Sequence, residues 1–488
     1  MNRSHNTSGP DPDIDWDELP QAAGLCSLDL ACCSGPSVEE SVKSLKYFHY
    51  AFQRIWRILT SRLTSEPVYE VKMVFSHHAY LCSENVKLLR DRVAEMRQPP
   101  LGLEKVPHED LKAFFDEIQN APETHQVISG LYETALPLME EAMDRHRDET
   151  NPLADAPTRR LLRFALLDVG DMLETGEQLV VAYNDRIVSD RDIMEWPDTL
   201  NGYLDRAGGM DGSLPVDEEM KKVDITPLFS DRPFEYDSTP RRDYRFPDPF
   251  NMGVHAEEYL YNPQFSAWSK TLMMYFKRLR EIDVPEMMAT ILIETPDKDW
   301  NFYRDMTRQL WDEARHAIMG EVGFYKLGIN WPELVRINST WSRCLNEQLT
   351  PRERHAVLWF IEQGLMSKTG KRYEWEVGTE SGDELAALFQ DYDWADEVLH
   401  ARIGRDWYVR DFETVEKAAE YGSQCWSRVV SDWDKWARDG LTEHENWWPE
   451  LYREFCRLHD LPGNPEELAF NTSYRETRAD LQRISTSG

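Results

Sequence analysis

The chain has 488 residues, of which 88 are acidic and 55 basic, so its formal net charge is −33. This excess of negative charge repels phosphate backbones and anionic lipid heads, and we therefore expect neither nucleic-acid nor membrane-surface partners. The length exceeds that of a usual single domain and predicts two domains joined by a connector.

The seven cysteines are scattered and contain no Cys-x-x-Cys run. Their pattern indicates neither a disulfide framework nor a zinc cluster, and it is typical of a reducing compartment. No basic and apolar leader opens the chain, and no uninterrupted apolar run is long enough to cross a bilayer. We therefore expect a soluble, cytoplasmic protein.

The first half of the chain has helical periodicity after a polar start. Residues 1–37 are rich in Ser, Gly, Pro and Asp, and we interpret them as a mostly disordered arm. Apolar residues spaced three and four apart then predict four helical stretches, at about 41–59, 69–97, 108–147 with a break near Pro122, and from Asp155 onward. Four helices with modest connections are typical of an antiparallel bundle, here over 38–185.

Residues 186–264 combine Gly208-Gly209 and many prolines with many charges. They show no sustained periodicity, so we interpret them as a linker. Helical periodicity resumes near Phe265 and predicts a second four-helix set over 265–440, followed by a helical segment and tail over 441–488. We therefore expect an all-α protein with two bundles. The first half contains no Glu-x-x-His run, so the metal ligands are expected in the second bundle alone.

Two short runs in the second half have the spacing of metal ligands. In the first run, Glu313 and His316 are three residues apart in a stretch of good helix formers, so they project from the same helix face. The same arrangement returns in Glu397 and His400. A single Glu-x-x-His can arise by chance in a chain with 13 histidines, whereas two such runs are stronger evidence for a site.

A di-metal site in a helical bundle takes one Glu from each of two helices and a Glu-x-x-His from each of the other two. The second half can supply this set. Four carboxylates offset most of the charge of two iron ions, and one His per metal leaves open positions where dioxygen can bind. The alternative is that the two histidines are ordinary core or surface residues.

The run Asp312-Glu313-Ala314-Arg315-His316 resembles the Asp-Glu-x-Arg-His signature of the ferritin-like di-iron oxidases and oxygenases. The second run, from Asp396 to His400, differs by having Leu399 at the position of the Arg. The resemblance implies two ferritin-like bundles, the first without ligands. It also implies that Asp312 and Asp396 do not bind the metal themselves but orient the ligating histidines, and that Arg315 holds these aspartates in place.

The remaining two glutamate ligands are chosen by their positions along the helix axes. Glu281 precedes a turn near Asp297 by about 16 residues, as far as Glu313 follows it. At about 1.5 Å per residue, the alternative Glu286 would lie roughly 7 Å nearer to that turn. Pro285 favours Glu286 if the helix starts afresh there, so both candidates stay open with Glu281 preferred. On the third helix, Glu362 is preferred over Glu353 because it precedes Glu397 by 35 residues, a spacing that resembles the family.

By resemblance, we expect a dioxygen-dependent di-iron oxidase or oxygenase acting on a small organic substrate. Its partners would be dioxygen, that substrate and an electron donor, and a homodimer is an open alternative. Manganese or a mixed manganese–iron pair is the alternative to two iron ions. The alternative functions are those of a ferroxidase or peroxide-scavenging ferritin relative, or of a binding protein in which metal only joins four helices together.

Overall fold

A computed structural model describes residues 15, 18–96, 102–184, 194–216, 224–366, 370–429 and 433–474. Every regular element in these ranges is helical, and no strand occurs in them. The all-α class expected from the sequence is therefore confirmed. Within the same ranges, no helix is long and apolar enough to span a membrane. Most of the predicted N-terminal arm before Glu18 and the end of the tail after Tyr474 lie outside the described residues.

Contacts between residues divide the chain into two units, which are described separately. Unit 1 comprises residues 1–51, 88–114 and 128–228, and unit 2 comprises residues 52–87, 115–127 and 229–488. The domain boundaries predicted at residues 38, 185, 265 and 440 stay a prediction.

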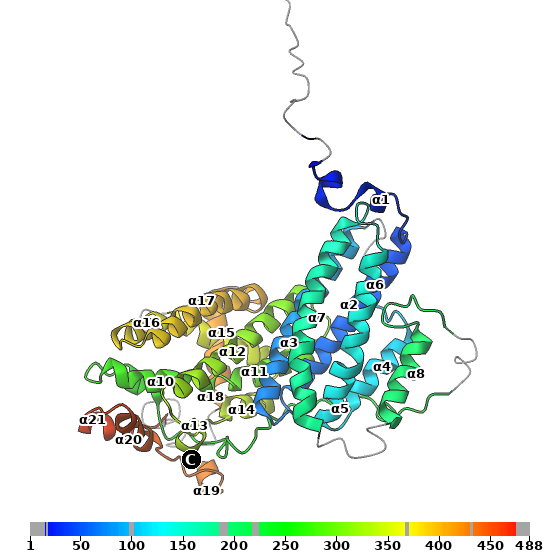
Figure 1. Cartoon of the computed structure of the whole chain (residues 1–488). Coiled ribbons are helices and arrows are strands. Elements are labelled where there is room, and N and C mark those ends of the chain that lie inside the picture. The colour runs from blue at the N-terminus through cyan, green and yellow to red at the C-terminus, as the bar shows by residue number, and fades with distance from the viewer. Residues whose placement is uncertain are drawn as a thin grey trace, which may run out of the picture. The chain divides into compact units, whose positions relative to one another are not determined.

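The first half of the chain forms helices close to those expected (Figure 1). The fourth of them begins where the sequence indicated, because the Asp155 side chain accepts a hydrogen bond from the Thr158 amide and caps it. Within unit 1, α6 and α7 pack side by side. In chain order the helices are α1 (Leu28–Ala31), α2 (Val38–Arg62), α3 (Tyr69–Glu95), α4 (Glu109–Asn120), α5 (Thr124–Ile128), a π-helix (Ser129–Ala135), α6 (Leu136–Glu149) and α7 (Ala156–Tyr183).

The region interpreted as a linker contains a regular helix, α8 (Trp196–Ala207), and a short one, α9 (Ala256–Leu260). Helix α8 buries Trp196, Leu200, Tyr203 and Leu204, which recur at three and four residues. It ends at Gly208, whose φ of 77° is in the left-handed region that favours glycine. The sequence did not indicate α8, because its short run of periodic apolar residues lies among charged residues, prolines and glycines.

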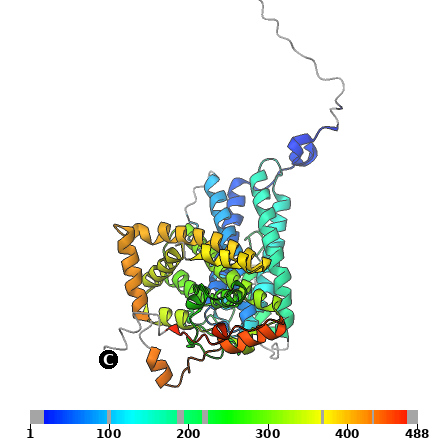
Figure 2. The same ribbon diagram turned by 90° about the vertical axis from the view of Figure 1, so that its left-hand side faces the viewer.

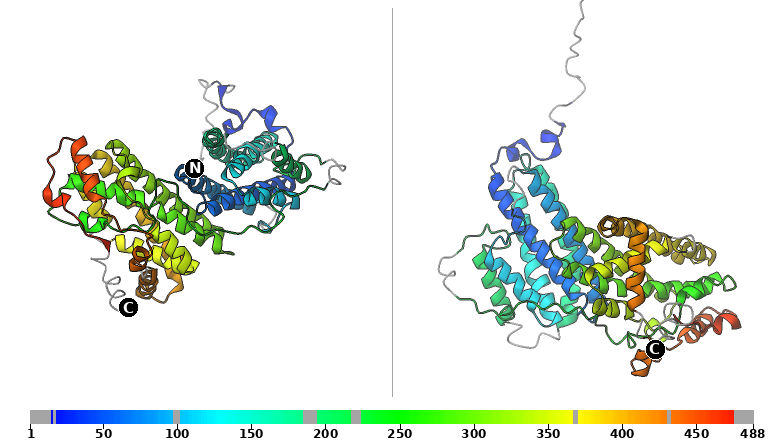
Figure 3. Two further views of the ribbon diagram at one scale, coloured as in Figure 1. Left: turned by 90° about the horizontal axis from the view of Figure 1, so that it is seen from below. Right: turned by 180° about the vertical axis from the view of Figure 1, so that it is seen from behind.

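Unit 2 contains the helices that carry the predicted ligands (Figure 2 and Figure 3). Helix α16 follows α15 in the chain and carries none of the six predicted ligands. The helices are α10 (Ala267–Arg280), α11 (Asp283–Glu294), α12 (Trp300–Lys326), α13 (Trp331–Leu334), α14 (Thr340–Gln348), α15 (Pro351–Leu365), α16 (Lys371–Glu380), α17 (Glu384–Trp407), α18 (Val415–Val429), α19 (Trp433–Arg438), α20 (Trp448–Leu458) and α21 (Pro465–Leu468).

Contacts among five helices place the predicted ligands near one another. Helix α12 packs against α10, α11 and α17, and α15 packs against α11 and α17. In Figure 2, α18 (orange) runs across the direction of α16 and α17, and it packs on α15. A large apolar core lies around α10, with Tyr275 and Phe276 from that helix and Trp447 and Trp448 from the C-terminal segment.

The close approach of α10 and α12 requires a glycine. A Cβ atom at Gly320 would lie 2.3 Å from the Leu279 nitrogen and 2.5 Å from the Tyr275 carbonyl oxygen. Both are backbone atoms, so they cannot move aside as the end of a flexible side chain can. Gly320 therefore fixes the distance between two helices that carry predicted ligands.

We predict that Gly320→Ala lowers the free energy of unfolding by roughly 1–3 kcal/mol, because its methyl group overpacks the α10–α12 contact. The control is Gly364→Ala on α15, where a Cβ would meet nothing within 4 Å. It should leave stability unchanged or raise it by about 0.5–1 kcal/mol. Urea unfolding followed by tryptophan fluorescence measures both. Equal stability of the two variants would contradict the packing described.

Candidate metal centre

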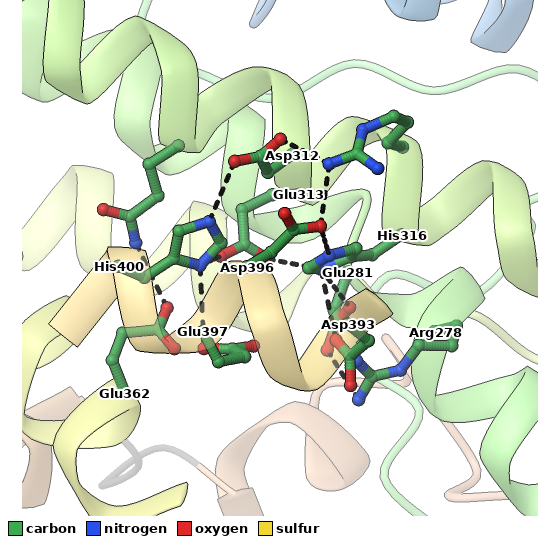
Figure 4. Close-up of polar contacts among 12 residues, drawn as sticks. Arg278, Glu281, Asp312, Glu313, His316, Glu362, Asp393, Asp396, Glu397 and His400 are labelled. Carbon is green, nitrogen blue, oxygen red and sulfur yellow. Dashed lines mark hydrogen bonds and ion pairs between the residues drawn. The ribbon is translucent and has the colours of Figure 1, made fainter. Parts of the chain in front are cut away.

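Six predicted ligand residues converge in the interior of unit 2 (Figure 4). Helix α12 contributes Glu313 and His316, and α17 contributes Glu397 and His400. Glu362 comes from α15 and Glu281 from the end of α10. Five of the six are buried, and Glu281 keeps 15 % of its side-chain surface exposed. The spacing of three in each run places Glu and His on one helix face, as the sequence indicated.

The distances suit metal ions. His316 Nδ1 lies 3.4 Å from Glu281 Oε2 and 3.8 Å from Glu313 Oε2. His400 Nδ1 lies 3.2 Å from Glu313 Oε1 and 3.6 Å from Glu397 Oε2. Ligand atoms at about 2.0–2.2 Å from one ion lie up to about 4.4 Å apart, so these separations are compatible with coordination.

The candidate ligands form overlapping groups. One atom from each of Glu313, Glu362, Glu397 and His400 lies within 4.8 Å of the others, and so does one atom from each of Glu281, Glu313 and His316. Glu313 belongs to both groups. A third group joins His316 and Glu397 to Asp393, which was not among the predicted ligands.

Each of the six residues presents one buried atom that forms no hydrogen bond of good geometry, although several of these atoms lie within 3.2–3.8 Å of one another. These atoms are the Nδ1 of both histidines, Oε1 of Glu313, and Oε2 of Glu281, Glu362 and Glu397. Buried polar atoms in folded proteins are nearly always hydrogen-bonded, because an unsatisfied one is costly. Six such atoms in one cluster fit a site for cations, which would satisfy all of them.

The opposite oxygen of three of the glutamates is held by the protein. The Arg278 guanidinium lies 3.1 Å from Glu281 Oε1, and the Lys371 ammonium lies 2.7 Å from Glu397 Oε1. Gln309 Nε2 donates a hydrogen bond of 3.3 Å to Glu362 Oε1. Each carboxylate is thus anchored through one oxygen and leaves the other for a ligand.

The two histidines are held through their other ring nitrogens by the aspartates of the two runs, in a crossed arrangement. His316 Nε2 lies 3.2 Å from Asp396 Oδ2, and His400 Nε2 lies 3.4 Å from Asp312 Oδ2. Each Asp therefore contacts the His of the other run. A histidine that ligates through one ring nitrogen commonly donates the other N–H to a carboxylate, which fixes the ring and its tautomer.

Arg315 serves both aspartates. Its Nη2 donates to Asp312 Oδ1 at 2.5 Å and to Asp396 Oδ2 at 2.7 Å. Arg308 Nε adds hydrogen bonds of 3.0 and 2.9 Å to the two oxygens of Asp312. Burial alone would raise the pKa of Asp312, but His400, Arg315 and Arg308 lower it to about 2. Arg315 therefore contacts the aspartates of both runs. This is compatible with the second run having Leu399 where the first run has an arginine.

The cluster concentrates negative charge that positive charge must offset. Burial raises the pKa of Glu362 well above its usual range, and the charges of Glu397 and Glu313 raise it further. Burial opposes protonation of His316 and His400, yet the surrounding carboxylates raise both pKa values well above the ordinary one. Protons or metal cations can supply the charge that these carboxylates attract, and metal binding would displace the protons.

Three further charged residues at the cluster were not found from the sequence. Asp393, Lys371 and Arg278 are all fully buried. Lys371 Nζ lies 2.8 and 2.9 Å from the Asp393 oxygens, and Arg278 also pairs with Asp393. Asp393 precedes Glu397 by one helical turn, a spacing that could have indicated it. Lys371 and Arg278 come from other helices and left no signal in the sequence.

The structure places Glu281 in the cluster and Glu286 elsewhere. Helix α10 ends at Arg280 and α11 begins at Asp283, so the helix does start afresh near Pro285. Glu286 nevertheless belongs to none of the candidate ligand groups found among the described residues. It pairs with Lys72, accepts hydrogen bonds from Arg242 and accepts one of 2.9 Å from Ser342 Oγ. This geometry favours Glu281, because the charge of Glu286 is already offset by two buried cations.

Asp396→Asn is expected to weaken metal binding about 10–100-fold, because it disturbs the partner that orients His316. The control is Asp391→Asn, an exposed position on the same helix. Competition with a chromophoric chelator measures both affinities. Wild-type affinity in Asp396→Asn would show that the crossed Asp–His contacts do not support a metal.

Glu281→Gln and Glu286→Gln form a matched pair that separates the two candidates. Glu281→Gln should weaken metal binding at least tenfold with a modest effect on stability. Glu286→Gln should retain metal binding but lower the free energy of unfolding by roughly 3 kcal/mol, because Lys72 and Arg242 lose a buried partner. Chelator competition and urea unfolding of each variant give the two readouts, and the reverse pattern would assign Glu286 as the ligand.

Comparison of the chain with protein-family models, curated protein sequences and solved structures gave no match. The geometry alone therefore supports a metal site. It establishes an all-helical protein with a buried cluster of glutamates and histidines that could hold metal ions.

Proposed function

We propose that unit 2 contains a ferritin-like four-helix bundle that binds two iron ions. The four members would be the α10–α11 pair, α12, α15 and α17, each of which contributes at least one glutamate to the cluster. The contacts of α12 with α11 and α17, and of α15 with the same two helices, support this arrangement.

In this proposal Glu281 and His316 hold one ion, and Glu362 and His400 hold the other. Glu313 lies within both ligand groups, and Glu397 lies near both histidines, so these two carboxylates would be shared between the ions. The observation that carries the proposal is the set of six buried atoms without hydrogen-bond partners, one on each of these residues. Manganese in one or both positions is compatible with the same oxygen and nitrogen ligands.

The function that we propose is the dioxygen-dependent oxidation of a small organic substrate. Two iron ions held in this way would supply the electrons with which dioxygen is reduced. The protein would anchor the ligands through Arg278, Lys371 and Gln309, fix the imidazoles through the two aspartates, and exclude bulk water by burying the cluster. The resemblance of the two runs to the ferritin-like di-iron oxidases and oxygenases supports the step from a di-iron site to oxidation.

Anaerobic loading with ferrous iron followed by exposure to air tests this function. We predict that the wild-type chain binds about two iron ions and develops new absorption bands in air. Glu313→Gln removes the carboxylate common to both groups, so it should bind fewer than one ion and give no bands. The control is Glu380→Gln, an exposed position on α16.

Three other outcomes would contradict the proposal. A wild-type chain that binds no iron would remove the metal site. Two bound ions that do not respond to air would indicate a site that only joins the helices. Rapid oxidation of many iron ions per chain, without dependence on an organic substrate, would indicate a ferroxidase.

A further inference from the structure

A cavity of about 170 Å³ lies directly beside the cluster, between α10–α11, α14 and α15. Glu313, Glu362 and Glu397 form part of its wall, so a molecule bound there would lie next to the proposed metal pair. Most of the remaining wall is apolar and includes Leu358 and Ile361. Since the cavity reaches the ligands, its shape and charge limit what can be oxidised there.

The size of the cavity suits a small molecule. An apolar protein cavity of about 150 Å³ holds one benzene ring. A cavity of 170 Å³ can therefore hold a single small ring or a short aliphatic chain. The apolar wall around Leu358 would bind such a group by removing its surface from water.

The polar side of the cavity carries an arginine with a free donor. Arg280 lines the cavity, and its Nη2 donates to Glu257 Oε1 at 3.0 Å. Its Nη1 is buried and has no hydrogen-bond partner. The other cation on this side, Lys277, already pairs with Glu374. Arg280 therefore keeps one nitrogen without a partner, on a side of the cavity that also carries Glu257, Glu281 and Asp283.

We infer that the substrate is a small carboxylic acid, with one ring or a short chain, whose carboxylate binds Arg280. This inference rests on the proposed oxidative function. A carboxylate is the group that best satisfies a guanidinium with free N–H donors, because both oxygens accept in the plane of the fork. With the acid group at Arg280, the apolar part would lie along Leu358 and Ile361, beside Glu313 and Glu362.

The inference is tested by the equilibrium binding of two probes of similar shape at neutral pH. Benzoate carries a carboxylate, and benzyl alcohol is uncharged. Isothermal titration calorimetry is done on the full chain after treatment with a chelator, without iron or dioxygen. Benzoate should bind at least tenfold more tightly than benzyl alcohol. Arg280→Gln should abolish this preference, whereas Arg405→Gln, an exposed arginine on α17, should keep it.

A second variant tests the location independently. Leu358→Trp fills the cavity, so it should weaken the binding of both probes at least tenfold. The inference is overturned if benzoate binds no more tightly than benzyl alcohol, if Arg280→Gln keeps the preference, or if Leu358→Trp binds both probes as the wild type does. Because no metal takes part in this measurement, its failure is distinguishable from failure of the iron and dioxygen experiment.

Discussion

The interior of unit 2 holds a cluster of four glutamates and two histidines, five of them buried, and each of the six presents a buried atom for which no hydrogen bond is formed. Carboxylates brought together away from water repel one another, and folding must offset that repulsion with positive charge. The protein supplies part of it through Arg278 and Lys371, which contact the oxygens facing away from the shared space. The remaining demand for positive charge lies in the middle of the cluster, where cations could bind the separate ligand groups that share Glu313.

A second buried acidic network in the same unit provides the comparison. Glu286 is as deeply buried as Glu313, but Lys72, Arg242 and Ser342 contact its oxygens. That network is satisfied within the protein and needs no ligand, so it is suited to stabilising the fold. The two sites show that burial of a glutamate does not by itself indicate function. The distinguishing feature is whether the buried oxygens find partners within the chain.

The sequence predicted the helical class and indicated the two Glu–His pairs of the cluster, because both depend on local periodicity. Glu313 with His316, and Glu397 with His400, share a helix face at a spacing that is visible without any structure. Residues that come from other helices were not visible in this way, and Lys371 is the main example. The restart near Pro285 was anticipated, but only the positions of Lys72 and Arg242 account for the placement of Glu286. The cavity likewise depends on side chains from several helices, so no pattern in the chain could have indicated it.

Anomalous X-ray diffraction from a crystal of the iron-loaded chain, recorded on both sides of the iron absorption edge, tests the central claim most directly. Our account predicts two iron peaks about 3.5–4 Å apart, as is usual for paired metal sites. One should lie beside His316 and Glu281, and the other beside His400 and Glu362. No peak within this cluster, or peaks bound only by other residues, would contradict the account.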